Sequence, residues 1–380
     1  MIRQLDMPLY ARGLCLLVLF ASPLATAQTA PPVIVDVSAI GQSYTTDDGT
    51  ITQVTVPLRA SFQIARNVSM NVRTAFATAS GDGLEPLSGL TDTQVGTRFS
   101  GTVGKGIVDV SLSASLPTGQ TALSLDQLAT ASTLSLDDYA FATPSFGRGA
   151  VLAPGISVAL PVSQTAAVGM GAVYSISSEY TLVQSDEAAY MPGNELLLTA
   201  GLDATLGRIG LVTVEGSYVQ YGDDSYREAT YSPGGALGGT VRLALGTGPI
   251  RTRLLASARR VTDGTLSVPS TRFQATIPYT RPTQNTLALG VDVVQPGFDV
   301  GLTGGFRTYA SEAEPQSDTA PVAALANEQV LLDIGIAPSF RLSSTARLRG
   351  AVTYTRAVGE EAEDAPFSGM RASAGLRIGL

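Results

Sequence analysis

Residues 370–380 read Met-Arg-Ala-Ser-Ala-Gly-Leu-Arg-Ile-Gly-Leu, so that every second residue is apolar. The even-numbered residues would therefore share one face of a β-strand, while the arginines, the serine and the glycines would share the other. A half-buried strand of a soluble sheet has the same pattern. The number of such segments along the chain decides between the two fold classes.

The alternation recurs in sixteen segments of about ten residues, the length that a tilted strand needs to cross a bilayer. We predict an all-β fold, a transmembrane antiparallel up-and-down β-barrel of about 16 strands, with 12 and 14 strands as alternatives. The predicted strands are 32–44, 50–63, 67–78, 91–103, 107–116, 149–160, 166–179, 194–206, 209–221, 236–246, 249–261, 285–295, 298–309, 329–341, 345–357 and 367–380.

The connections between these segments alternate between short and long, which is typical of an outer-membrane barrel. Short turns include Gly104-Lys105-Gly106 and Gln295-Pro296-Gly297. Outward-facing aromatic side chains also gather near the strand ends, as in the two aromatic girdles of such barrels. The long connections lie near 117–148, 180–193, 222–235, 262–284, 310–328 and 358–366.

The N-terminus has the features of an export signal. Arg3 and Arg12 supply positive charge, an apolar run extends from Gly13 to Phe20, and Ala25-Thr26-Ala27 supplies the small residues that a signal peptidase reads. We predict a signal peptide at 1–27, export by the Sec route and a mature barrel over 28–380.

Composition excludes several classes of function. The chain has no His, a single Cys and a net charge of -8. The absence of His excludes Ser-His and Cys-His nucleophiles and His-ligated metals, and the acidic balance disfavours a nucleic-acid partner. We therefore expect neither an enzyme nor a cofactor, catalytic residue or metal site.

Two stretches resemble a known family. Gly89-Leu90-Thr91-Asp92-Thr93-Gln94-Val95-Gly96, followed by the run from Val110 to Pro117-Thr118-Gly119, is similar to a motif of exported barrels named as transporters of the meta-pathway of phenol degradation. The resemblance implies a transport role. Read by themselves, Asp92 and Pro117-Thr118-Gly119 are residues that cap a turn and end a strand.

The face opposite the apolar one would line the lumen. The candidate pore-lining residues are Arg242, Arg251, Arg253, Arg259, Arg307, Arg341, Arg347, Arg349, Arg371, Arg377, Asp109, Glu215, Asp292, Asp299 and Asp333. Arg59, Arg73, Arg98 and Asp36 belong to the same face. The arginines either attract anions to the pore or pair with carboxylates and brace neighbouring strands. Both roles are compatible.

We predict a channel in the outer membrane of a Gram-negative-type bacterium that passes small solutes, with hydrophobic or aromatic compounds as candidates. The expected partners are outer-membrane lipid, the barrel-assembly machinery and the solute. The loop 117–148 would either fold into the lumen or form a surface subdomain. The alternative function is a structural or adhesive barrel with a plugged lumen.

Overall fold

The computed structural model describes residues 33–47, 49–136, 139–186, 188–269, 274–279, 283–310, 329–358 and 367–380. The predicted signal peptide lies outside these ranges, as do most residues of the predicted loops 310–328 and 358–366.

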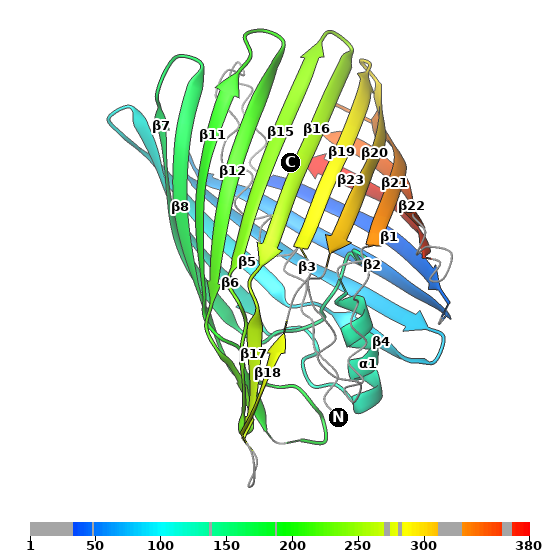
Figure 1. The fold of residues 1–380 in the computed structure, drawn as a ribbon. Helices are drawn as coiled ribbons and strands as arrows, with labels where there is room; N and C mark the ends of the chain where they lie inside the picture. The colour runs from blue at the N-terminus through cyan, green and yellow to red at the C-terminus, as the bar shows by residue number, and fades with distance from the viewer. Residues whose placement is uncertain are drawn as a thin grey trace.

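Sixteen antiparallel strands close into a barrel, as predicted (Figure 1). β1 and β23 close it, in a register that runs from Ile34 opposite Gly379 to Thr45 opposite Ser368. The sixteen are β1 (Val33–Thr46), β2 (Gly49–Ala65), β3 (Val68–Gly81), β5 (Thr93–Val103), β6 (Gly106–Leu116), β7 (Val151–Pro161), β8 (Ala166–Ser177), β11 (Glu195–Thr205), β12 (Gly210–Tyr221), β15 (Ala236–Thr247), β16 (Ile250–Val261), β19 (Thr283–Val294), β20 (Phe298–Ala310), β21 (Gln329–Arg341), β22 (Ala346–Val358) and β23 (Ser368–Gly379).

The outer face of the barrel is apolar and exposed. Leu289, Leu302 and Ile334 are 49%, 57% and 58% exposed, and residues of the same parity behave alike on the other strands. Phe298 and Phe340 stack on this face near the short turns, with ring centroids 6.3 Å apart. An apolar belt of this extent is stable only in contact with lipid. No helix in the described ranges is both long and apolar enough to span a membrane.

The wall contains one element that the periodicity of the sequence did not predict. β4 (Leu84–Leu90) pairs with the distal half of β3, and β5 pairs with the proximal half. β4 and β5 therefore act as one wall strand that is interrupted at Thr91 and Asp92. The sequence of β4, Leu-Glu-Pro-Leu-Ser-Gly-Leu, contains a proline and lacks strict alternation, so periodicity did not reveal it.

A second sheet extends beyond the barrel from the long connections (Figure 1). Its strands have only two to six residues, too few for a period to be read from sequence. Asp224 supports it by accepting hydrogen bonds from the Tyr190 hydroxyl (2.6 Å) and the Gly193 N–H (2.7 Å). Burial, and then the nearby Asp224 carboxylate, raise the pKa of Tyr190. The strands are β9 (Tyr180–Thr181), β10 (Ala189–Met191), β13 (Asp224–Tyr226), β14 (Ala229–Ser232), β17 (Gly264–Pro269) and β18 (Gln274–Tyr279).

Adjacent residues at the middle of β23 test the assignment of the two faces. Ala374 lies on the exposed apolar face and Ser373 on the inner face. Ala374→Arg should lower the free energy of unfolding by about 2–4 kcal/mol, because its charge would enter the hydrocarbon. Ser373→Arg should cost much less, because its charge would enter the polar lumen. Denaturant titration in lipid measures both, and equal losses would contradict the assignment.

Candidate functional site

All fifteen candidate pore-lining residues lie on the inner face of the barrel. Their parity is opposite to that of the exposed apolar side chains of the same strands. Arg59, Arg73, Arg98 and Asp36 have the same placement. The inner wall of the barrel is therefore charged on both its early and its late strands.

Six ion pairs connect these residues. Each pair joins side chains of two different strands, so it links these strands on the inner face of the wall. The pairs are Arg98–Asp109 at 2.8 Å, Arg242–Glu215 at 3.7 Å, Arg253–Asp292 at 2.8 Å, Arg307–Asp333 at 3.0 Å, Arg347–Asp299 at 3.0 Å and Arg349–Asp36 at 3.5 Å. The structure thus brings together several arginines and carboxylates that the sequence could only assign to one face.

Several of these charged side chains remain open to solvent inside the barrel. The side chain of Arg253 is 60% exposed even though it donates a hydrogen bond to Asp292. Arg59 and Arg371 are also exposed. Exposure of inward-facing side chains requires open space, so part of the lumen is hollow. Within the described residues, no group of His, Cys, Asp and Glu side chains is placed to hold a metal ion.

The long connection between β6 and β7, residues 117–150, contains the helix α1 (Leu125–Leu134). Ser124 caps this helix: its hydroxyl accepts from the Gln127 N–H, and the Gln127 side chain accepts from the Ser124 N–H. Thr130 on the helix donates to the carbonyl of Glu85 in β4 at 2.7 Å. This helix was not predicted from the sequence, although a Ser-x-x-Gln capping box was a readable signal.

Two buried glutamines hold the second half of this connection against the inner wall. Gln53 of β2 donates to the carbonyl of Thr143 (2.6 Å) and accepts from its N–H (2.9 Å). Gln42 of β1 donates to the carbonyl of Ala140 (3.1 Å) and accepts from the Ala142 N–H (2.6 Å). Gln42 and Gln53 lie opposite each other in the β1–β2 register. Both glutamines bind the backbone as a neighbouring strand would.

Aromatic side chains strengthen the same contact. Tyr139 and Phe141 of the connection pack around Tyr44 of β1, with ring centroids 5.5 Å and 5.1 Å from that of Tyr44. Phe367, just before β23, stacks on Tyr44 at 5.5 Å. Tyr44 and Phe141 are 3% and 6% exposed. Such edge-to-face and stacked pairs stabilise beyond the area that they bury, so this part of the lumen is firmly filled.

Asp92 joins the two ends of the connection. Its carboxylate accepts from the Gly119 N–H at 3.0 Å and from the Arg148 N–H at 2.7 Å. Thr118 adds a second tie, because its hydroxyl donates to the Thr91 carbonyl and accepts from the Thr93 N–H. The residues that carry the family resemblance therefore hold the two ends of the connection at the barrel wall by hydrogen bonds.

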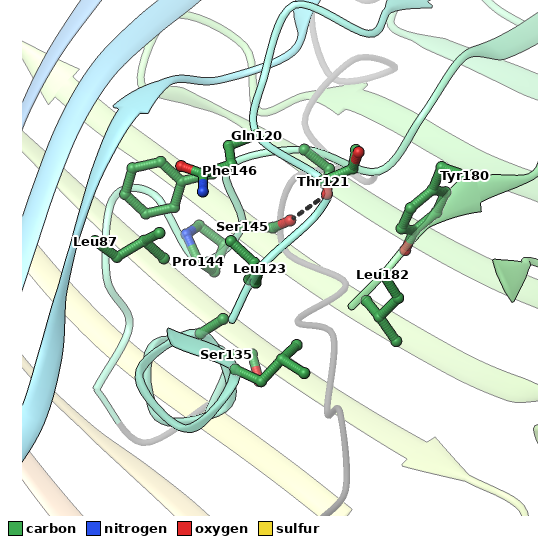
Figure 2. A pocket seen from close by; sticks show the side chains of 13 residues that line it. Leu87, Gln120, Thr121, Leu123, Ser135, Pro144, Ser145, Phe146, Tyr180 and Leu182 are labelled. Atoms are coloured by element: carbon green, nitrogen blue, oxygen red, sulfur yellow. Dashed lines mark hydrogen bonds between the residues drawn. The ribbon is translucent and has the colours of Figure 1, made fainter. Parts of the chain in front are cut away.

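A small cavity lies between α1 and the returning chain (Figure 2). Its volume is about 40 Å³ and its lining is mostly apolar, with Leu87, Leu123, Phe146 and Leu182 around it. This volume holds a few water molecules. It is too small for an organic solute.

No family model and no curated protein matches the chain. Among solved structures, the chain is similar to the CymD monoaromatic hydrocarbon channel, with 12% identity over 91% of this chain and 88% of that chain and a TM-score of 0.43. It is also similar to the COG4313 outer membrane channel from Pseudomonas putida F1 (10% identity, 94% and 99%, TM-score 0.40). A third is a loop L8 deletion mutant of OmpT, an outer membrane protein of Vibrio cholerae (10%, 92% and 99%, TM-score 0.40).

These likenesses concern the barrel fold. Because no family model matches, the resemblance to the phenol-pathway transporters stays a prediction.

Removal of the Asp92 carboxylate should loosen the connection without opening the barrel. In Asp92→Ala, Gly119 and Arg148 lose their acceptor, at about 0.5–1.5 kcal/mol for each hydrogen bond. Trypsin cleavage after Arg148 should accelerate by about tenfold, while circular dichroism shows unchanged strand content.

The matched control is Asp82→Ala. Asp82 accepts one backbone hydrogen bond, from the Thr50 N–H at 2.9 Å, but touches neither end of the connection. Equal cleavage rates in the two variants would contradict the role of Asp92.

Proposed function

We propose that this protein is a passive channel of the bacterial outer membrane for small solutes, narrowed by residues 117–150. The observation that carries the proposal is the exposure of inward-facing charged side chains, such as Arg59 and Arg253, behind an outer face that is apolar. A side chain can be exposed there only if water fills part of the lumen. Barrels of this width leave such an aqueous space.

The same proposal implies how the chain is exported and in which membrane it lies. Sec-dependent export through residues 1–27 and insertion by the barrel-assembly machinery would deliver the chain to the outer membrane. The lipid-facing belt supports this location, because it needs an acyl environment along the full circumference. The charged inner wall supports solutes that are small and at least partly polar, while the resemblance to phenol-pathway transporters favours aromatic ones.

One observation favours the alternative of a plugged structural or adhesive barrel. The aromatic cluster around Tyr44 and the paired glutamines form a dense block at the long-connection end of the lumen. The two functions differ in conductance. A channel gives discrete current steps in a planar bilayer, whereas a plugged barrel that is equally well folded gives none.

Loss of the two glutamines should widen the channel. Gln42→Ala with Gln53→Ala removes four hydrogen bonds between the wall and residues 140–143. Single-channel conductance should rise, because the connection can then leave the wall, and deletion of 120–146 should raise it further.

Gln63→Ala serves as the control. Gln63 donates to the Ala65 and Val68 carbonyls at the β2–β3 turn, far from the connection. Conductance in the double variant equal to that of wild type would place residues 117–150 outside the conducting path.

A further inference from the structure

Six inward-facing charged residues lie side by side on six adjacent strands across the closure of the barrel. Each is the register partner of the next, which places neighbouring Cβ atoms about 5 Å apart. We name this set the arginine ramp: Arg73 on β3, Arg59 on β2, Asp36 on β1, Arg377 on β23, Arg347 on β22 and Arg341 on β21.

The ramp leads from the mouth at the short turns into the lumen. Arg341 is the last residue of β21, whereas Arg73 is the sixth residue of β3. A difference of five residues corresponds to about 16 Å along a strand, and it follows from the tilt that closure imposes. Thr55 precedes Arg59 on β2 and lies further from the short turn. Its hydroxyl shares a hydrogen bond with the hydroxyl of Thr143, at 3.1 Å. The ramp therefore ends below the connection that narrows the pore.

Charge on the ramp is unbalanced, in contrast to the rest of the wall. Elsewhere, four arginines each have a carboxylate of their own: Arg98, Arg242, Arg253 and Arg307. On the ramp, Asp36 is the single acid, and it pairs with Arg349. With Arg349 and Asp299 included, six arginines face two aspartates, a net charge of +4. Within the described ranges, no carboxylate pairs with the side chains of Arg59, Arg341 or Arg377.

The register also sets arginines directly opposite each other. Arg59 faces Arg73, and Arg347 faces both Arg377 and Arg341. Like charges directly opposite each other on a sheet are destabilising. An anion bound between two guanidinium groups would remove this cost, and the planar donor fork of arginine matches the two oxygens of a carboxylate or phosphate group.

We propose that the arginine ramp binds small oxyanions, carboxylates and phosphates, and passes them along the lumen between the short-turn mouth and residues 117–150. This inference rests on the proposed channel function and specifies its solute class. Arg59, the second residue from the inner end of the ramp, is exposed, so a solute in the lumen can reach it. Several weak positions in series permit both entry and release, which a single tight site would prevent.

The test compares two double variants that remove the same charge. Arg59→Gln with Arg377→Gln changes the ramp, whereas Arg260→Gln with Arg356→Gln changes two exposed arginines of the outer face. Reversal potential under a KCl gradient should show chloride preference in wild type. The ratio of chloride to potassium permeability should fall at least about twofold in the ramp variant and stay unchanged in the control. Equal ratios in the two variants would overturn the proposal.

A second double variant, with conservative substitutions, separates the effect of positive charge from the effect of the planar donor arrangement of the guanidinium group. Arg59→Lys with Arg377→Lys keeps both charges, and it also protects the test if the glutamine variant fails to fold. It should keep the chloride preference but weaken the block of current by inorganic phosphate and by acetate, added separately. Block by only one of the two anions identifies which oxyanion the ramp accepts. Undiminished block by both in the lysine variant overturns the bidentate site.

These measurements distinguish an error in the ramp proposal from an error in the channel proposal. Current steps without anion preference would overturn the ramp and leave the channel standing. If the folded barrel gives no steps, calorimetric titration of the detergent-solubilised protein with phosphate still tests the ramp. Binding should be at least about fivefold weaker in the glutamine ramp variant than in the outer-face control, and equal binding would overturn the proposal.

Discussion

The pairing of β1 with β23 is the constraint on which the structure depends. In the hydrocarbon of a bilayer an unpaired backbone N–H or C=O has no water to bind, so a sheet with open edges cannot remain there. Closure removes both edges at once. It also divides every strand into a lipid face and a lumen face, and it places Asp36 of the first strand beside Arg377 of the last.

Closure at this strand number creates a second requirement. A cylinder of sixteen strands is too wide for wall side chains to fill, so the interior has to be solvated, occupied by chain, or both. This protein uses both solutions. Residues 117–150 fill the end near the long connections through Gln42, Gln53 and the rings around Tyr44, while arginines remain exposed in the rest of the lumen. Asp92 makes the filling stable by fixing both ends of the inserted chain.

The charged side chains of the inner face have two arrangements. Some form ion pairs between strands, and others lie beside like charges. Pairs such as Arg98–Asp109 and Arg307–Asp333 join different strands and neutralise each other. At the seam between the first and last strands, arginines face arginines across the register. Ion pairs on a wet wall contribute little to stability individually. They leave the net positive charge concentrated at this seam, on one side of the lumen.

The sequence by itself determined the barrel, its sixteen strands and the residues that face inward, because a period of two over ten residues is a local property of each segment. It did not reveal β4 or the second sheet, whose strands are irregular or too short for periodicity, and α1 was missed although its capping box was a readable signal. Tertiary structure alone decided which arginine meets which carboxylate, and that Arg59, Asp36, Arg377 and Arg347 form one row. Those neighbours are set by strand register and closure, which bring together residues from opposite ends of the chain.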